Sequence, residues 1–125
     1  MIVGHGVDLV EVARLGRSVE RFGDRFLERV FTEGERAYAG DGPRRDEHLA
    51  ARFAAKEAVL KALGTGWAQG VGWTDIEVVR GASGKPDLFL HGKAAELATG
   101  IGATRWHLSL THTGTMALAS VIAEG

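Results

Sequence analysis

The longest helical pattern of apolar and polar positions in the chain runs from Leu49 to Leu63. It contains no Gly or Pro and is rich in strong helix formers, and Gly64 follows it where a helix C-cap is expected. This stretch therefore predicts a helix over residues 49–63. We expect the rest of the chain to be organised around it.

The N-terminal apolar run from Ile2 to Val7 is typical of a buried strand. Gly4 and Gly6 within it would allow another backbone to approach closely. Asp8 follows the run and has capping-box spacing to Glu11. Asp8 is therefore either an acid at the end of a strand, a frequent position for site residues, or the N-cap of a helix.

Apolar residues recur at steps of three and four from Val12 to Val30 and predict a helix, which Gly23 could interrupt. At roughly 100° per residue, five arginines share an arc of about 120° beside this apolar stripe. These are Arg14, Arg17, Arg21, Arg25 and Arg29. The face is either solvated surface paired with neighbouring acids or a docking surface for an acidic partner helix.

The remaining patterns predict an α+β fold in which a mostly antiparallel sheet packs against the long central helix. A capping box at Thr32 opens a short helix, and alternating or apolar runs bounded by turn residues mark the strands. The expected elements are a helix over 33–38, a loop over 40–46, a hairpin of 75–79 and 87–90, a helix over 93–98, and a strand pair of 106–110 and 116–123.

Length and composition narrow the classes of function. A chain of 125 residues forms one domain, over 1–125, that buries about two-thirds of its unfolded surface but is small for a deep cleft, which suggests a site shared between subunits. With 15 basic and 16 acidic residues and no recognisable motif, we expect no nucleic-acid partner. Cysteine, a signal peptide and a membrane-length apolar run are all absent, so we expect a soluble cytoplasmic protein without a membrane partner.

Phe53, Glu57 and Lys61 stand four residues apart and so share one face of the predicted helix. A carboxylate that can hold a divalent metal, one turn before a lysine that can neutralise a phosphate, suits phosphoryl chemistry, although Glu and Lys at this spacing are also a favoured surface pair. Asp8 and Glu57 together would suit Mg²⁺, which accepts one or two carboxylates and completes its shell with water and substrate phosphates.

Two turns offer weaker candidates. The loop Gly84-Lys85-Pro86 could present backbone groups and a cation to an anionic ligand, or be a plain turn. His112, beside Ser109 and Thr111, could meet a phosphate or be an exposed turn histidine.

Five motifs in this order resemble the holo-acyl-carrier-protein synthase family, the small bacterial class of 4'-phosphopantetheinyl transferases. The motifs are Gly6-Val7-Asp8-Leu9, Arg52-Phe53-Ala54-Ala55-Lys56-Glu57-Ala58 with Lys61, Gly64-Thr65-Gly66, Asp75-Ile76-Glu77 with Gly84-Lys85-Pro86, and Leu108-Ser109-Leu110-Thr111-His112. The resemblance runs over essentially the whole chain.

The resemblance implies transfer of the phosphopantetheine arm of coenzyme A to a serine of apo acyl carrier protein, with release of adenosine 3',5'-bisphosphate. It implies Mg²⁺, or Mn²⁺ in its place, held by Asp8, Glu57 and the coenzyme A diphosphate, with Lys61 on that diphosphate. Glu57, through a metal-bound water, is the first candidate for the base that deprotonates the serine, and His112 is the second.

The resemblance also implies contacts for both substrates and a homotrimer with sites at subunit interfaces. Candidates for the nucleotide are Arg52, Gly84, Lys85, Pro86 and His112; candidates for carrier-protein docking are Arg14, Arg21, Arg25 and Phe26. Two other functions are compatible with these residues. A metal-dependent phosphoesterase could use the same acids and lysine, and a non-catalytic carrier-protein-binding module would need only the arginine face.

Overall fold

The computed structural model describes the backbone of residues 1–125 and every side chain except that of Ala68. The elements are β1 (Ile2–Glu11), α1 (Val12–Phe22), α2 (Asp24–Val30), α3 (Glu33–Ala39), α4 (Arg45–Leu63), the 3-10 turns η1 (Ala68–Gly70) and η2 (Trp73–Asp75), β2 (Ile76–Arg80), β3 (Pro86–Leu90), α5 (Gly92–Gly100), β4 (Arg105–His112) and β5 (Met116–Glu124).

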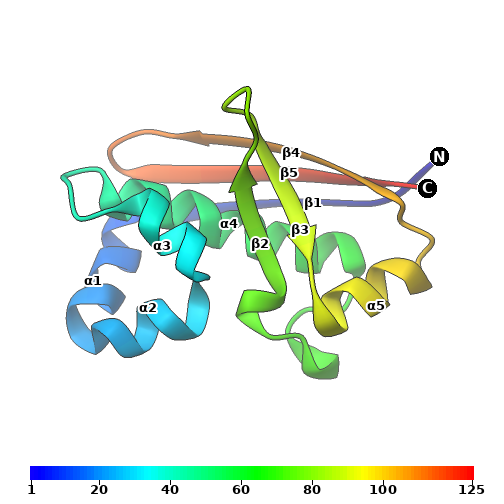
Figure 1. Cartoon of the computed structure of the whole chain (residues 1–125), viewed down its shortest axis with the longest axis horizontal. Coiled ribbons are helices and arrows are strands. Elements are labelled where there is room, and N and C mark those ends of the chain that lie inside the picture. Colours follow the sequence, from blue (N-terminus) through cyan, green and yellow to red (C-terminus); the bar gives the residue numbers. More distant parts are fainter.

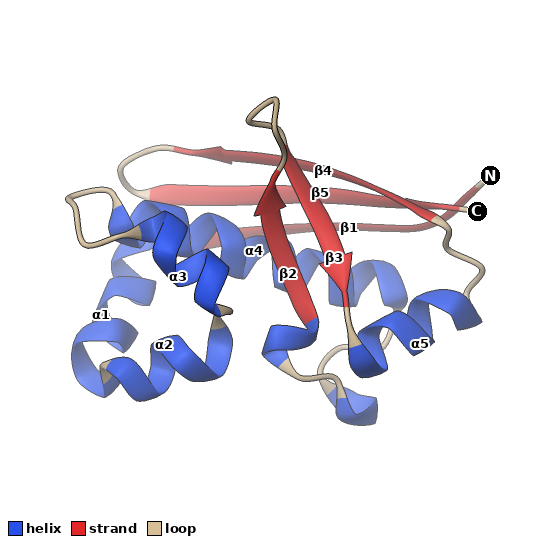
Figure 2. Ribbon diagram, in the orientation of Figure 1, coloured by secondary structure: helices blue, strands red, loops and turns tan.

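The predicted α+β architecture is confirmed. Strands β1, β5 and β4 form an antiparallel sheet in that order, and β2 and β3 form a separate antiparallel hairpin. Helix α4 runs beneath the three-stranded sheet, with α1, α2 and α3 at one end of the molecule and α5 at the other (Figure 1). Figure 2 shows the hairpin crossing in front of α4, so the central helix is enclosed by β-structure and short helices.

Helix α4 begins at Arg45, four residues before the predicted start at Leu49. Asp46 and Glu47 occupy its first turn, where carboxylates stabilise the positive end of the helix dipole. Its end at Leu63 is as predicted, because Gly64 adopts the left-handed conformation with φ of 77°. Among the residues that the structure describes, no helix has both the length and the apolar character needed to cross a bilayer.

Strand β1 packs directly on the backbone of α4, as its two glycines predict. A Cβ atom on Gly4 would lie 2.5 Å from the carbonyl oxygen of Ala62. A Cβ atom on Gly6 would overlap the carbonyl oxygen of Ala58 and lie 2.8 Å from its carbonyl carbon. Glycine is therefore required at both positions for this close approach.

The expectation that Asp8 ends the first strand or caps a helix is wrong. The strand continues to Glu11, and Asp8 lies inside it, opposite Ala119 of β5. Helix α1 then begins at Val12, with no side-chain cap. Ladder pairing with β5 extends β1 past Asp8, and this non-local pairing overrides the local capping pattern.

Gly23 does interrupt the helix predicted over residues 12–30. Its φ of 60° lies in the region that favours glycine, so α1 and α2 are two separate helices.

The capping box predicted at Thr32 is confirmed and is part of a buried ion pair. Thr32 Oγ1 accepts from Glu35 N at 3.2 Å, and Glu35 Oε1 accepts from Thr32 N at 2.9 Å. The same carboxylate lies 2.9 Å from Lys56 Nζ, with both side chains fully buried. Lys56 also donates to the carbonyl oxygens of Trp73 and Ile76, so α3, α4 and the start of β2 are joined. Burial lowers the pKa of Lys56, and the Glu35 carboxylate opposes this effect.

Candidate active site

Asp8, Glu57 and Lys61 converge where β1 crosses α4. Lys61 Nζ donates to Asp8 Oδ1 at 3.0 Å and to the carbonyl oxygen of Val7 at 2.9 Å. Glu57 precedes Lys61 by one turn of α4, so it faces the same strand. The glycine-mediated contact between β1 and α4 holds these three side chains together, although Asp8 and Lys61 are 53 residues apart in sequence.

An open groove of about 600 Å³ exposes the two carboxylates. Its walls come from β1, α1, α2, α4 and the start of β5, and they include Asp8, Arg14, Phe26, Phe53 and Glu57. Two residues predicted to dock a carrier protein, Arg14 and Phe26, therefore line the same groove as the two candidate metal ligands. The surface predicted to dock a carrier protein therefore lies directly beside the candidate metal ligands.

The environment of Glu57 perturbs the pKa of its carboxyl group. Burial raises its pKa and the nearby Asp8 charge raises it further, while a hydrogen bond from Trp67 and the charge of Lys61 act in the opposite direction. Trp67 Nε1 donates to Glu57 Oε1 at 3.4 Å. The Trp67 ring lies 3.8 Å from that of Trp73, which stacks on Phe53 at 4.9 Å. The contact of Trp67 with Glu57 has no counterpart in the sequence patterns, because Trp67 lies in an irregular turn.

The two carboxylates fit a magnesium ion. Among the described residues no group of three or more His, Cys, Asp or Glu side chains could hold a metal, so a closed all-protein site is not formed. Mg²⁺ is usually bound by one or two carboxylates and retains open positions for water and phosphate. Asp8 and Glu57, facing one open groove and close enough for the Asp8 charge to act on Glu57, form such a donor set.

Two residues predicted to bind the nucleotide, Arg52 and His112, lie outside the groove that contains Asp8 and Glu57. His112 ends β4, on the opposite edge of the three-stranded sheet from β1, and its Nδ1 lies 3.0 Å from Glu47 Oε1. Arg52 is only 2% exposed, and its guanidinium lies 4.2 Å from the centre of the Tyr38 ring. His48 connects the two, with its ring 5.2 Å from Tyr38 and 5.7 Å from His112.

Gly84 and Lys85 lie in the loop between β2 and β3, Pro86 is the first residue of β3, and none of the three lies in these clusters. Lys85 and Pro86 line a second groove of about 600 Å³, together with Arg105, Trp106 and His107 of β4. A single chain therefore assembles Asp8, Glu57 and Lys61, but it leaves the candidate nucleotide contacts in two separate places.

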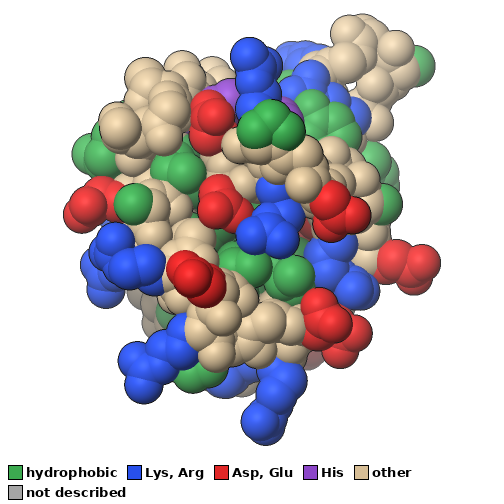
Figure 3. Space-filling view, turned by 90° about the vertical axis from the view of Figure 1, so that its left-hand side faces the viewer, with side chains coloured by type: hydrophobic (Ala, Val, Ile, Leu, Met, Phe, Trp, Pro, Cys, Tyr) green, Lys and Arg blue, Asp and Glu red, His purple; other side chains and the backbone are tan. Residues whose placement is uncertain are grey.

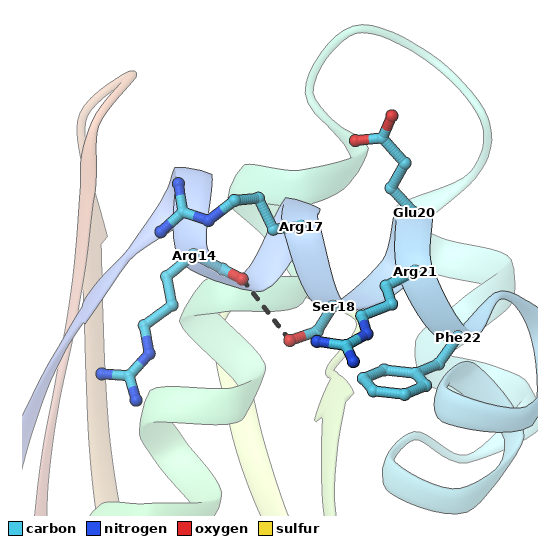
Figure 4. Close-up of a pocket in the computed structure, with 6 residues that line it drawn as sticks. All are labelled: Arg14, Arg17, Ser18, Glu20, Arg21 and Phe22. Atoms are coloured by element: carbon cyan, nitrogen blue, oxygen red, sulfur yellow. Dashed lines mark hydrogen bonds between the residues drawn. The ribbon is translucent and has the colours of Figure 1, made fainter.

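The five arginines predicted to share one helical face do not form one continuous face. Because the chain turns at Gly23, one groove is lined by Arg14, Arg17 and Arg21 of α1 and a second by Arg25 and Arg29 of α2, with Phe22 in both. Figure 4 shows Arg21 beside the Phe22 ring, where its guanidinium lies 5.2 Å from the ring centre.

Within the part of the chain whose side chains are described, none of these arginines forms an ion pair with a carboxylate. Basic side chains project from this end of the molecule with acidic ones between them (Figure 3). The arginines therefore remain available to an acidic partner.

Comparison with known proteins identifies the family. Residues 4–115 match the model of the 4'-phosphopantetheinyl transferase superfamily. A holo-[acyl-carrier-protein] synthase of Solibacter usitatus is 53% identical, over 99% of both chains. The crystal structure of the holo-[acyl-carrier-protein] synthase of Neisseria meningitidis superposes with a TM-score of 0.88, at 36% identity and full coverage of both chains. That of Bacillus anthracis, in complex with CoA (3',5'-ADP), has a TM-score of 0.80 at 39% identity, covering 98% of this chain and 96% of that one. The chain therefore belongs to the holo-[acyl-carrier-protein] synthase family of the 4'-phosphopantetheinyl transferase superfamily.

Proposed function

We propose that the chain transfers the 4'-phosphopantetheine group of coenzyme A to a serine of apo acyl carrier protein, giving holo carrier protein and adenosine 3',5'-bisphosphate. The observation that carries this function is that Asp8 and Glu57 line one open groove, with Lys61 bonded to Asp8, in a member of this family. Its relatives are named holo-[acyl-carrier-protein] synthases, and the related structures from Bacillus anthracis and Helicobacter pylori are complexes with CoA (3',5'-ADP) and with coenzyme A.

In the proposed mechanism the serine oxygen attacks the phosphorus that carries the pantetheine arm, and the bond from this phosphorus to the nucleotide phosphate breaks. Lys61 binds the diphosphate and offsets the charge that develops on the leaving oxygen. Asp8 and Glu57 would hold Mg²⁺, or Mn²⁺ in its place, and the ion would neutralise charge on the diphosphate. Glu57 is the first candidate to accept the serine proton, since burial raises its pKa towards the working pH, and His112 is the second.

We further propose a homotrimer whose active sites lie between subunits. The candidate nucleotide contacts Arg52, Lys85 and His112 are separated from the metal ligands within one chain, and a neighbouring copy could supply them. Strand β1 is an open sheet edge, and it exposes apolar side chains: Val7 is 45% exposed and Leu9 59%. Such a face is suited to burial against another copy.

Mixing two inactive variants tests the shared site. Glu57→Gln removes a group of the metal half, and His112→Ala removes a group of the nucleotide half. If each site takes one half from each of two subunits, dissociating and reassociating a mixture restores part of the activity that each variant has lost. Light scattering measures the mass of the assembly, and a monomeric active species would refute the trimer.

The docking surface proposed for the carrier protein comprises Arg14, Arg21, Arg25 and Phe26. This face was predicted to dock an acidic partner, and the guanidinium groups of α1 and α2 suit the carboxylates of such a partner. A cytoplasmic location remains a prediction from the sequence.

The direct test is to incubate the protein with apo acyl carrier protein, coenzyme A and Mg²⁺ and to weigh the carrier by mass spectrometry. A gain of one phosphopantetheine mass supports transfer. Release of phosphate without that gain would instead support the phosphoesterase alternative. Binding of the carrier with neither change would support a non-catalytic binding module.

A further inference from the structure

We propose that Lys61 has a second role, as an internal counter-cation that occupies Asp8 until the coenzyme A diphosphate draws it away. A divalent metal then binds tightly only together with the donor. This inference rests on the proposed function, since it concerns the same metal and diphosphate.

The position of the Lys61 ammonium carries the argument. Its Nζ lies 3.0 Å from Asp8 Oδ1 and 2.9 Å from the carbonyl oxygen of Val7, so two oxygens of β1 hold it where a cation bound to Asp8 would be. The Asp8 side chain is 18% exposed and that of Lys61 is 55% exposed. The carboxylate is therefore mostly covered, whereas the ammonium bonded to it remains open to a ligand.

The two carboxylates of the site differ in whether a cationic side chain is paired with them. Asp8 is paired with a cation, whereas Glu57 accepts a hydrogen bond from Trp67 and, within the described side chains, forms no ion pair. A metal ion that binds without coenzyme A must either displace the Lys61 ammonium or bind beside it. Repulsion between the two positive charges lowers the affinity of the site for that ion. Arg14, in the wall of the same groove, adds to this effect.

A diphosphate changes this balance. An ion pair between partly exposed side chains is weak, so a ligand with several negative oxygens can draw the lysine away from one carboxylate. Asp8 is then free to bind the metal. A metal on Asp8 would in turn keep Lys61 away from the carboxylate and on the diphosphate. The two ligands favour each other's binding, and the coupling is reciprocal. Without the donor, the lysine also protects the site from occupation by divalent ions that bind oxygen and nitrogen ligands more tightly than Mg²⁺ does.

The test is a titration with Mn²⁺, followed by electron paramagnetic resonance of the free ion, on wild type and two Lys61 variants without coenzyme A. Lys61→Met removes the charge and keeps the length, and Lys61→Arg keeps the charge. We expect Lys61→Met to bind Mn²⁺ about fivefold or more tightly than wild type, as the loss of an opposing partly exposed charge allows. Lys61→Arg should resemble wild type. Equal or weaker binding by Lys61→Met would overturn the inference.

Two further measurements locate the effect. In an Asp8→Asn background the gain from Lys61→Met should disappear; a gain that persists would show that the lysine acts through general charge and not through Asp8. Adding coenzyme A should raise Mn²⁺ affinity by a larger factor in wild type than in Lys61→Met, and equal factors would contradict the proposed displacement.

Failure of this inference is distinguishable from failure of the proposed function. Carrier labelling by the wild-type protein tests the function without reference to metal affinity. If wild type labels the carrier and Lys61→Met binds Mn²⁺ no more tightly, only the counter-cation role is refuted.

Discussion

The contact between β1 and α4 makes Gly6→Ala the most informative single substitution. The added methyl group would overlap the carbonyl oxygen of Ala58 and lie 2.8 Å from its carbon, whereas ordinary contacts begin near 3.4 Å. Both opposing atoms belong to the helix backbone and cannot rotate away. The strand and the helix must therefore separate by more than 1 Å, and overpacking of this kind costs about 1–3 kcal/mol or more.

The consequence for activity follows from the same displacement. Asp8 lies two residues after Gly6 on the same face of β1, so moving the strand away from α4 lengthens the distance from Asp8 to Lys61 and Glu57. We expect the melting temperature to fall by about 4–12 °C, at roughly 4 °C for each kcal/mol in a chain of this size, and Mn²⁺ affinity to fall with it. Calorimetry and the Mn²⁺ titration measure the two effects.

Gly114→Ala is the matched control, because no atom lies within 4 Å of a Cβ atom built there. It should leave both quantities nearly unchanged. If Gly6→Ala melted at the wild-type temperature and labelled the carrier at the wild-type rate, the argument that backbone contact between β1 and α4 positions the site would be refuted.

Three further predictions address the buried pair, the acid and the docking surface. Lys56→Met leaves its buried partner carboxylate uncompensated and should lower the free energy of unfolding in urea by about 3–5 kcal/mol, whereas the control Lys93→Met should change it little. Because the pKa of Glu57 is raised, its carboxyl group is protonated at pH values where an ordinary glutamate is still ionised. As the pH is lowered, Mn²⁺ affinity should therefore begin to fall at a pH above the one at which an ordinary glutamate titrates. Trp67→Phe removes the hydrogen bond that opposes this pKa shift and should move the fall in Mn²⁺ affinity to higher pH. An unchanged dependence of Mn²⁺ affinity on pH would show that this hydrogen bond does not affect Glu57. Arg14→Glu should chiefly raise KM for the carrier protein, and Lys93→Glu, on α5 at the other end of the molecule, should not (Figure 1).

The local elements were predictable because each depends on interactions over a few residues. Residue types at a few neighbouring positions are enough to predict the capping box at Thr32, the helix end at Leu63 and the interruption at Gly23. The glycines of the first strand likewise predicted a close backbone neighbour, although not which one.

Non-local contacts decided where the candidate chemistry lies. Pairing of β1 with β5 extends the strand through Asp8 and turns that residue towards α4, which no capping rule predicts. The same assembly places Trp67 against Glu57 and leaves Arg52 and His112 in a separate cluster. Periodicity assigns a side chain to a face of its own element, but which faces meet depends on how sheet and helices pack, because that packing joins residues far apart in sequence. The sequence by itself therefore determined the elements and the candidate residues, and only the tertiary structure decided which of those residues share a site.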